Sequence, residues 1–241
     1  GRESGLQLVG AVELQVTDDY LPLHHRPGKI PFSANLDYIL TICRPDVLVD
    51  FTVAQATMPA VRLAAERGVN LVIGTTGLAA DELEEIEQLS ATHQVGIVVA
   101  ANFALGAILM IHMAQLAAKY LDYAEIIELH HNQKADSPSG TALATAKAMV
   151  MARDKPFHLS SQQEKASASR GEMVGGVALH SVRLPGLMAH QEVLLGGVGQ
   201  TLSIRHDTIN RECYVPGVVL AIKEVVKCKG LVYGLDALLG L

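Results

Sequence analysis

The stretch from residue 128 to residue 141, which reads E-L-H-H-N-Q-K-A-D-S-P-S-G-T, holds the side chains best suited to chemistry in this chain. A histidine can donate a proton near neutral pH, a lysine carries a compact positive charge, and the start of a helix presents backbone N–H groups to anions. This combination predicts a site for a small substrate with two negative charges. The residues concerned are His130, His131, Lys134, Ser139, Gly140 and Thr141.

A strand and a helix are expected to position these residues. Residues 124–129 are apolar and β-branched, which predicts a strand. Because neighbours on a strand point to opposite faces, His130 and His131 can share a cavity only if the strand ends there. After a turn, Ser139 is a good N-cap for the alanine-rich residues 141–149, which favour a helix. Each feature alone has a structural explanation, as a helix cap or a structural histidine, but their combination in one loop favours a site.

The same stretch resembles the signature of the dihydrodipicolinate reductase family, whose motif reads approximately E-x-H-H-x-x-K-x-D-A-P-S-G-T-A. Within that motif the chain departs at Ser137, where the family has alanine. The resemblance covers the chain from about residue 36 to its end. Further segments similar to the family are residues 46–52, 72–77, 100–103, 180–186, 205–207 and 230–234.

The resemblance implies that the chain reduces 4-hydroxy-tetrahydrodipicolinate with NADH or NADPH, in the biosynthesis of diaminopimelate and lysine. It implies that His130 is the general acid, and an ordinary histidine pKa near 6.5 would keep it partly protonated at neutral pH. Lys134 would stabilise negative charge and hold a carboxylate with help from His131. Ser139, Gly140 and Thr141 would bind the second carboxylate, without a metal. The family further implies a homotetramer built through the second domain.

Two alternatives to this reductase stay open. One is a different NAD(P)-dependent reductase with the same two-domain plan. The other is a non-catalytic relative that binds or assembles without turning over a substrate.

The composition limits the function classes. With 241 residues, 49% of them hydrophobic, the chain can hold one or two domains. Its longest apolar run, residues 103–116, is interrupted by polar residues and predicts a buried helix rather than a membrane span. A net charge of −6 argues against a nucleic-acid partner. Three widely spaced cysteines and the lack of a secretory leader favour the cytoplasm, and the cysteine spacing predicts no metal site.

Short apolar strands alternate with amphipathic helices over residues 6–101. This alternation predicts a doubly wound parallel sheet of the Rossmann type. Strands are expected over residues 6–12, 47–51, 70–73 and 96–99, helices over 55–67 and 79–90, and a loop over 18–33.

The pattern changes after residue 102. A helix to about residue 120 comes first, and later strand-like segments are joined by glycine-rich turns, which predicts an antiparallel or mixed sheet. These segments are residues 177–184, 191–195 and 201–205, and a helix over 215–227 follows them. The expected fold is therefore α/β with a second α+β domain. Residues 1–101 with 212–241 would bind the dinucleotide, and residues 102–211 would bind substrate and oligomerise.

Polar and small residues follow three of the expected parallel strands. Ligands on such sheets lie beyond the carboxyl ends of the strands, so these residues predict a cofactor site. By resemblance they contact the ribose and nicotinamide of the cofactor. They are Phe51, Thr52, Gly74, Thr75, Thr76, Ala101, Asn102 and Phe103.

Glu13 ends the first expected strand, where a carboxylate can bind the hydroxyls of an adenosine ribose. An ordinary polar strand end is an equally good interpretation. The next residue is Leu14 rather than the basic residue with which some family members bind a 2′-phosphate, which favours NADH over NADPH, although Arg26 and Lys29 are alternative sources of positive charge. The glycine-rich turn expected about 20 residues before Glu13 is absent from the sequence. We expect that the first strand and its glycine turn are missing from this sequence.

Overall fold

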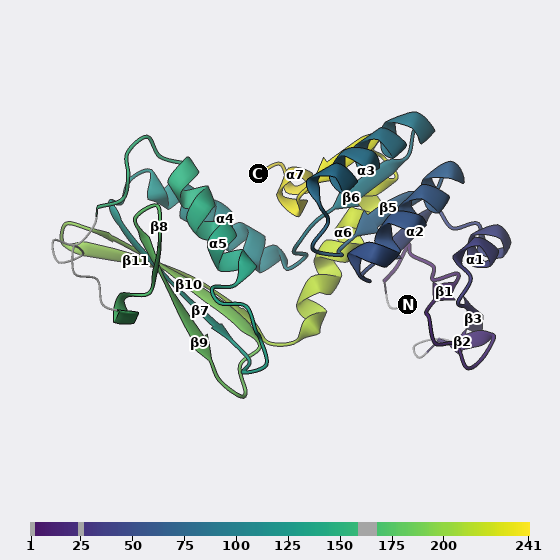
Figure 1. The fold of residues 1–241 in the computed structure, drawn as a ribbon, viewed down its shortest axis with the longest axis horizontal. Helices are drawn as coiled ribbons and strands as arrows, with labels where there is room; N and C mark the ends of the chain where they lie inside the picture. Colours follow the sequence, from purple (N-terminus) through teal and green to yellow (C-terminus); the bar gives the residue numbers. More distant parts are fainter. Residues whose placement is uncertain (1–2, 24–26, 159–167) are drawn as a thin grey trace. The chain divides into compact units, whose positions relative to one another are not determined.

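The chain forms two compact units, which the computed structural model describes over residues 3–23, 27–158 and 168–241 (Figure 1). The first unit comprises residues 1–103 and 215–241, and the second comprises residues 104–214. The sequence places these divisions after residue 101 and before residue 212. Phe103 belongs with the first unit because its ring packs against that of Phe51, with centroids 5.3 Å apart.

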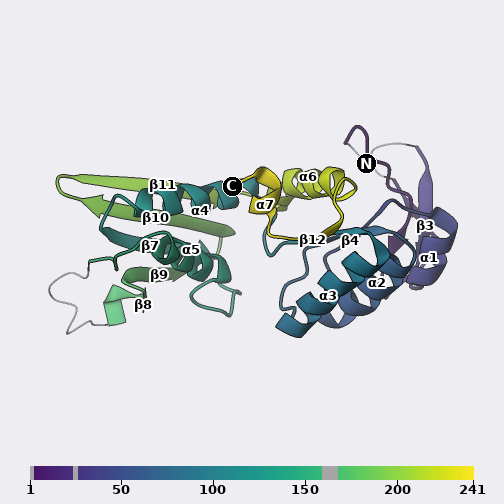
Figure 2. The ribbon, with the colours of Figure 1, turned by 90° about the horizontal axis from the view of Figure 1, so that it is seen from above.

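A four-stranded parallel sheet lies at the centre of the first unit and confirms the expected Rossmann-type fold. Its strand order is β12-β6-β5-β4, and every neighbouring pair is parallel. Helices α2 and α3 cover one face and α6 covers the other (Figure 2). The bounds are β4 Val47–Asp50, α2 Ala54–Glu66, β5 Asn70–Ile73, α3 Ala80–His93, β6 Gly96–Val99, α6 Val215–Val225, β12 Gly230–Tyr233 and α7 Leu235–Leu239.

The N-terminal segment differs from the prediction. Strand β1 covers only Ala11–Val12, and it pairs with β3 (Lys29–Ser33) in a separate three-stranded sheet with β2 (Tyr20–Pro22). The expected strand over residues 6–12 and the expected loop over residues 18–33 are therefore wrong. Gly10 packs closely against helix α1 (Leu36–Cys43), where an added Cβ would lie 2.8 Å from Ile39. The segment is therefore packed on α1 and does not join the parallel sheet.

The second unit is built on a five-stranded mixed sheet, as expected. Its order is β11-β10-β7-β9-β8; β7 and β9 run parallel, and the other pairs are antiparallel. Helices α4 and α5 pack on one face, around a core of methionine, alanine, valine and leucine side chains. The bounds are α4 Leu105–Ala118, β7 Tyr123–His130, α5 Gly140–Met151, η2 Ala168–Arg170, β8 Glu172–Val174, β9 Val177–Arg183, β10 Ala189–Gly197, β11 Gln200–Thr208 and η3 Arg211–Tyr214.

Candidate active site

A buried carboxylate lies at the centre of the histidine-rich site. Strand β7 alternates, so that Ala124, Ile126 and Glu128 point toward helices α4 and α5. The first two side chains join the apolar core, and the third is wholly buried, at 0% exposure. A buried charge is costly unless it is paired and hydrogen-bonded, so the partners of Glu128 determine what this site can do.

His130 is the first of these partners. It lies two residues after Glu128 on the same face of β7, and its Nδ1 is 2.5 Å from Oε2 of that carboxylate. Strand β7 ends at His130, which is the condition under which His130 and His131 could share a cavity. The His131 side chain is nevertheless exposed. Within the described part of the chain, Nε2 of His130 has no hydrogen-bond partner, and the side chain is 14% exposed. That nitrogen is therefore available to a ligand.

The pKa of His130 is lowered, which corrects the expectation of an ordinary histidine. Burial disfavours the charged imidazolium, and the positive charges of Lys134 and Arg183 add to this effect. The hydrogen bond and the charge of Glu128 act in the opposite direction and offset the shift only in part. Without substrate, the imidazole is therefore a weaker base than an exposed histidine.

Arg183 is the second partner and comes from strand β9. The register of the parallel β7–β9 pair sets it opposite His130, on the face that carries Glu128. Its two terminal nitrogens each lie 2.7 Å from a carboxylate oxygen of Glu128, a bidentate pair. Burial alone would raise the pKa of Glu128, but hydrogen bonds from Arg183, Ser181 and His130 outweigh it and hold that pKa below its usual range. The carboxylate is therefore ionised.

The third partner is the start of helix α5. Ser139 is its N-cap, as predicted, and its hydroxyl accepts a hydrogen bond of 3.2 Å from the backbone N–H of Ala142. The backbone N–H of Ser139 donates to Oε1 of Glu128 at 3.2 Å. Gly140 is exposed and no atom lies within 4 Å of where its Cβ would be, while Thr141 is half-buried. The helix start is thus open beside Glu128, and its free N–H groups and positive dipole end suit an anion.

Lys134 lies in the loop between β7 and α5. Its ammonium is 2.7 Å from Oδ1 of Asp136, and its backbone N–H donates to the carbonyl of His131. The carbonyl of Asp136 accepts a hydrogen bond of 2.7 Å from Arg183. Lys134 therefore has a solvent-exposed acidic partner, 58% exposed, that a substrate carboxylate could replace.

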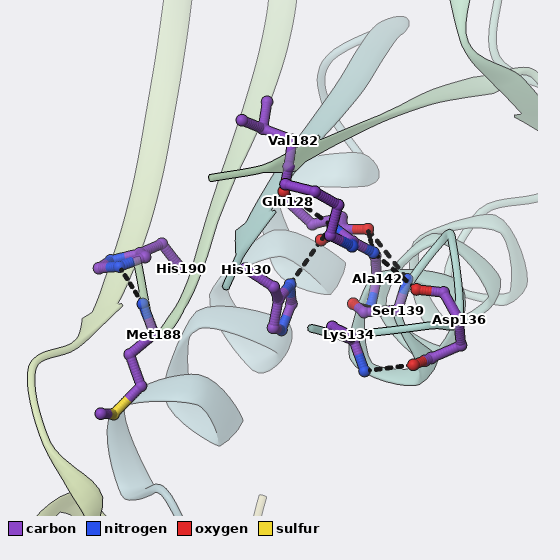
Figure 3. Close-up of polar contacts among 10 residues, drawn as sticks. Glu128, His130, Lys134, Asp136, Ser139, Ala142, Val182, Met188 and His190 are labelled. Atoms are coloured by element: carbon purple, nitrogen blue, oxygen red, sulfur yellow. Dashed lines mark hydrogen bonds and ion pairs between the residues drawn. The ribbon is translucent and has the colours of Figure 1, made fainter. Parts of the chain in front are cut away.

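The structure thus brings His130 and Ser139 into contact with Glu128, while Lys134 pairs with Asp136 in the loop between β7 and α5 (Figure 3). The sequence prediction omits Glu128 and Arg183 as site residues. A glutamate between apolar neighbours in a buried strand, two positions before a histidine, is a signal that could have identified the first. Arg183 lies in the segment 180–186, which resembles the family, but its pairing with Glu128 is not visible in the sequence because the two residues are 55 positions apart.

In the first unit, a second buried carboxylate organises the ends of the parallel strands. Asp50 closes β4 and accepts hydrogen bonds from the backbone N–H of Thr52 at 3.0 Å, from Thr57 at 2.5 Å and from Thr75 at 3.3 Å. The backbone N–H of Gly74 donates to the Asp50 carbonyl at 2.8 Å. The segments after β4 and β5 are therefore fixed side by side.

Phe51, Gly74 and Phe103 pack together at this same edge. A Cβ on Gly74 would lie 2.1 Å from Cε1 of Phe51, so the ring can take this position only beside a glycine. Thr76 and Ala101 are exposed at the same strand ends. These open strand ends, fixed by Asp50 and lined by small side chains, fit a dinucleotide.

The remaining predicted residues are Glu13, Asn102, Lys29 and Arg26. Glu13 is exposed and follows β1, which is not part of the parallel sheet, and its carboxylate accepts from the backbone N–H of Leu14. Asn102 is half-buried after β6. Lys29 lies over the ring of Tyr20, 4.1 Å from its centroid, and Arg26 lies outside the described residues.

A parallel sheet of the nucleotide-binding type, followed in the chain by a mixed-sheet unit with a buried Glu–His pair, is the architecture of a two-domain NAD(P)-dependent oxidoreductase. Two family models match the chain: "Dihydrodipicolinate reductase, N-terminus" over residues 2–103 and "Dihydrodipicolinate reductase, C-terminus" over residues 106–239. The chain therefore belongs to the dihydrodipicolinate reductase family, as its sequence motif indicates.

Individual relatives agree with this assignment. The chain is 57% identical over 240 residues to the 4-hydroxy-tetrahydrodipicolinate reductase of Dehalococcoides mccartyi, covering 100% of this chain and 91% of that protein. It is 53% identical to the reductase of the same name from Moorella thermoacetica, over 88% of this chain and 80% of the relative. A solved structure, dipicolinate-bound dihydrodipicolinate reductase from Paenisporosarcina sp. TG-14, matches with a TM-score of 0.86 and 37% identity, over 98% of this chain and 91% of that one.

Proposed function

We propose that this chain reduces 4-hydroxy-tetrahydrodipicolinate to tetrahydrodipicolinate with NADH or NADPH, in diaminopimelate and lysine biosynthesis. The observation that carries the proposal is an ionisable imidazole and an open helix start that both contact one buried carboxylate, with an ammonium in the loop between them. Such a group of positive and donor-rich elements complements a small ring with two carboxylates. Family membership supports the same reaction, and so does the dipicolinate bound by the related Paenisporosarcina protein.

Each side chain then has a chemical role. His130 gives a proton from Nε2 to the substrate as negative charge builds up on the ring. Lys134 exchanges Asp136 for a substrate carboxylate, with His131 assisting. Ser139, Gly140 and Thr141 receive the second carboxylate through backbone N–H and hydroxyl groups. In the reaction as proposed, fixed positive groups perform the electrostatic task.

The cofactor site is proposed at the strand ends of the first unit. The residues that would hold the nicotinamide and ribose are Phe51, Thr52, Gly74, Thr75, Thr76, Ala101, Asn102 and Phe103. When bound, the reduced nicotinamide supplies a hydride. Glu13 would bind the adenosine ribose, and the apolar Leu14, 88% exposed, favours NADH over NADPH because it offers no charge to a 2′-phosphate.

Gly74→Ala tests the cofactor site. The added methyl group displaces the Phe51 ring from Phe103, and because Phe51 is already half exposed, we expect the fold to survive. Displacement of a ring that is proposed to contact the cofactor should weaken NADH binding roughly two- to tenfold, as for loss of one aromatic contact of about 0.5–1.5 kcal/mol with the ligand. A fluorescence titration with NADH measures this, and Gly196→Ala is the control, since its Cβ would meet only Tyr123 at 3.4 Å. NADH affinity equal to wild type would remove Phe51 and Gly74 from the site.

The reaction itself is tested with the purified protein and a panel of substrates. We expect oxidation of NADH or NADPH, seen as loss of absorbance, with 4-hydroxy-tetrahydrodipicolinate and not with open-chain imines or monocarboxylates. Dipicolinate should compete with the substrate. Turnover of another substrate alone would indicate a different reductase, and binding without turnover would indicate a non-catalytic relative.

We also propose a homotetramer assembled through the second unit. Strand β11 is an open edge of the sheet, and where it meets α4 the apolar side chains Met113, Leu116, Tyr120 and Leu202 are exposed and adjacent. Light scattering of the purified protein, which should give four times the mass of the chain, measures the assembly state.

A cytoplasmic location is proposed because the three cysteines, Cys43, Cys213 and Cys228, are all free thiols. Separately, none of the described helices is long and apolar enough to span a membrane.

A further inference from the structure

Glu128 connects three parts of the second unit. Its carboxylate contacts His130 on its own strand, accepts two hydrogen bonds of 2.7 Å from Arg183 on β9, and accepts one of 3.2 Å from the backbone N–H of Ser139 at the start of α5. The side chain is completely removed from solvent. An apolar side chain here would avoid the cost of burying a charge, so the carboxylate requires an explanation beyond packing.

We propose that Glu128 is a positioning residue for the proton donor, which holds the imidazole of His130 in one orientation and one tautomer beside the helix start that receives a substrate carboxylate. This inference rests on the proposed function and deepens it. Glu128 itself contacts neither the substrate nor the cofactor in this account; it acts through His130 and Ser139.

The tautomer follows from the partner of Nδ1. An ionised carboxylate only accepts hydrogen bonds, so the imidazole nitrogen that faces it at 2.5 Å must carry a proton. In the neutral imidazole this leaves Nε2 unprotonated, and in the imidazolium Nε2 bears the second proton. When that proton passes to the substrate, the N–H bond at Nε2 breaks, and its electron pair stays on the ring. Glu128 remains a carboxylate throughout.

Arg183 keeps Glu128 from taking the proton itself. The bidentate pair favours the ionised carboxylate and fixes the plane of its two oxygens. The same guanidinium donates to the carbonyl of Asp136, which lies in the same loop as Lys134. One arginine–glutamate pair therefore fixes the histidine, the lysine loop and the helix start with respect to each other.

Glu128→Gln is the test, and Glu125→Gln is its matched control. Glu125 lies three residues earlier on β7, on the opposite face, and is likewise flanked by an arginine and a histidine, Arg170 and His180. Nitrogen-detected NMR of the ligand-free protein measures the tautomer and the pKa of His130. Steady-state kinetics over a range of pH then measures kcat and KM.

In Glu128→Gln we expect His130 to populate both tautomers and its pKa to fall further, because the negative charge that opposes Lys134 and Arg183 is lost. We expect kcat to fall by at least about tenfold, with an upper bound of about 10⁴-fold known for an orienting carboxylate replaced by its amide. KM should change little. Glu125→Gln should leave the tautomer of His130 and the pH profile as in wild type.

Retention of the wild-type tautomer and pH profile in Glu128→Gln would overturn the proposal and leave Glu128 a structural link between β7 and β9. If this variant does not fold, Glu128→Asp serves instead. Aspartate keeps the negative charge for Arg183, but its side chain is one methylene shorter and does not reach His130, so the imidazole should again populate both tautomers. Because the NMR measurement needs neither substrate nor turnover, a wild-type protein that fails to reduce the proposed substrate would leave this test intact.

Discussion

His130→Gln is expected to lower kcat by about 10²–10⁴-fold, the usual contribution of a positioned proton transfer. Glutamine is close to histidine in size and can still hydrogen-bond to Glu128, but it cannot deliver a proton at neutral pH. The proposed substrate contacts, at Lys134 and the start of α5, do not involve the imidazole. KM should therefore change much less than kcat in steady-state kinetics.

The pH dependence of the wild-type enzyme is expected to report the same group. As the proposed proton donor, His130 would have to be protonated to act, and in the ligand-free protein burial lowers its pKa. Because kcat/KM reports ionisations of the free enzyme, it should fall as pH rises, with a midpoint below about 6.5. In the enzyme–substrate complex, the two substrate carboxylates favour the imidazolium. The fall in kcat should therefore occur at higher pH than the fall in kcat/KM.

Both of these pH-dependent falls should be absent from His130→Gln. His131→Gln provides the comparison, because this exposed neighbour should affect KM more than kcat. A His130→Gln enzyme with wild-type kcat, or with the wild-type pH profile, would exclude His130 as the acid.

Local patterns in the sequence were sufficient to predict the elements that carry the site. The N-cap at Ser139 and the strand predicted over residues 124–129 depend on residues that are close together in sequence, and both are confirmed, the strand as Tyr123–His130. The Glu128–Arg183 pair is different in kind. It requires that β9 pair in parallel with β7 in one particular register, and periodicity within each strand does not determine that register.

The lowered pKa of His130 is likewise a property of the folded chain. The sequence gives the type of residue, but the shift comes from burial and from Arg183 on another strand, as well as from nearby Lys134. The sequence indicates neither the burial of His130 nor the register between β7 and β9, so it predicts only the ordinary pKa of a histidine.

The parallel sheet was predictable because β4, β5 and β6 are short apolar runs separated by amphipathic helices. The N-terminal segment was not. Prolines within residues 18–33 argue for a loop, yet Pro31 lies inside β3, while its neighbour Phe32 donates a hydrogen bond to the carbonyl of Asp19 at 2.9 Å. Ile30 within β3 is buried, which the sequence pattern does not reveal.

Lys134→Ala is expected to lower kcat/KM by about 10- to 100-fold, the range for loss of a hydrogen bond between charged groups of about 1.5–3 kcal/mol. Both kcat and KM should worsen, because Lys134 is proposed to bind a carboxylate and to stabilise the charge that develops during reduction. The variant also removes a positive charge that lowers the pKa of His130, so the fall of kcat/KM with pH should move to higher pH. Kinetics at several pH values measures both effects.

Asp136→Asn separates the charge of Lys134 from a structural role of its loop. The substitution removes the 2.7 Å ion pair that occupies the ammonium, whereas the carbonyl of residue 136 that binds Arg183 is retained. If a substrate carboxylate must displace Asp136 from Lys134, this variant should bind substrate more tightly and show a lower KM. A Lys134→Ala enzyme with unchanged KM, together with an Asp136→Asn enzyme whose KM does not fall, would place Lys134 outside the substrate site.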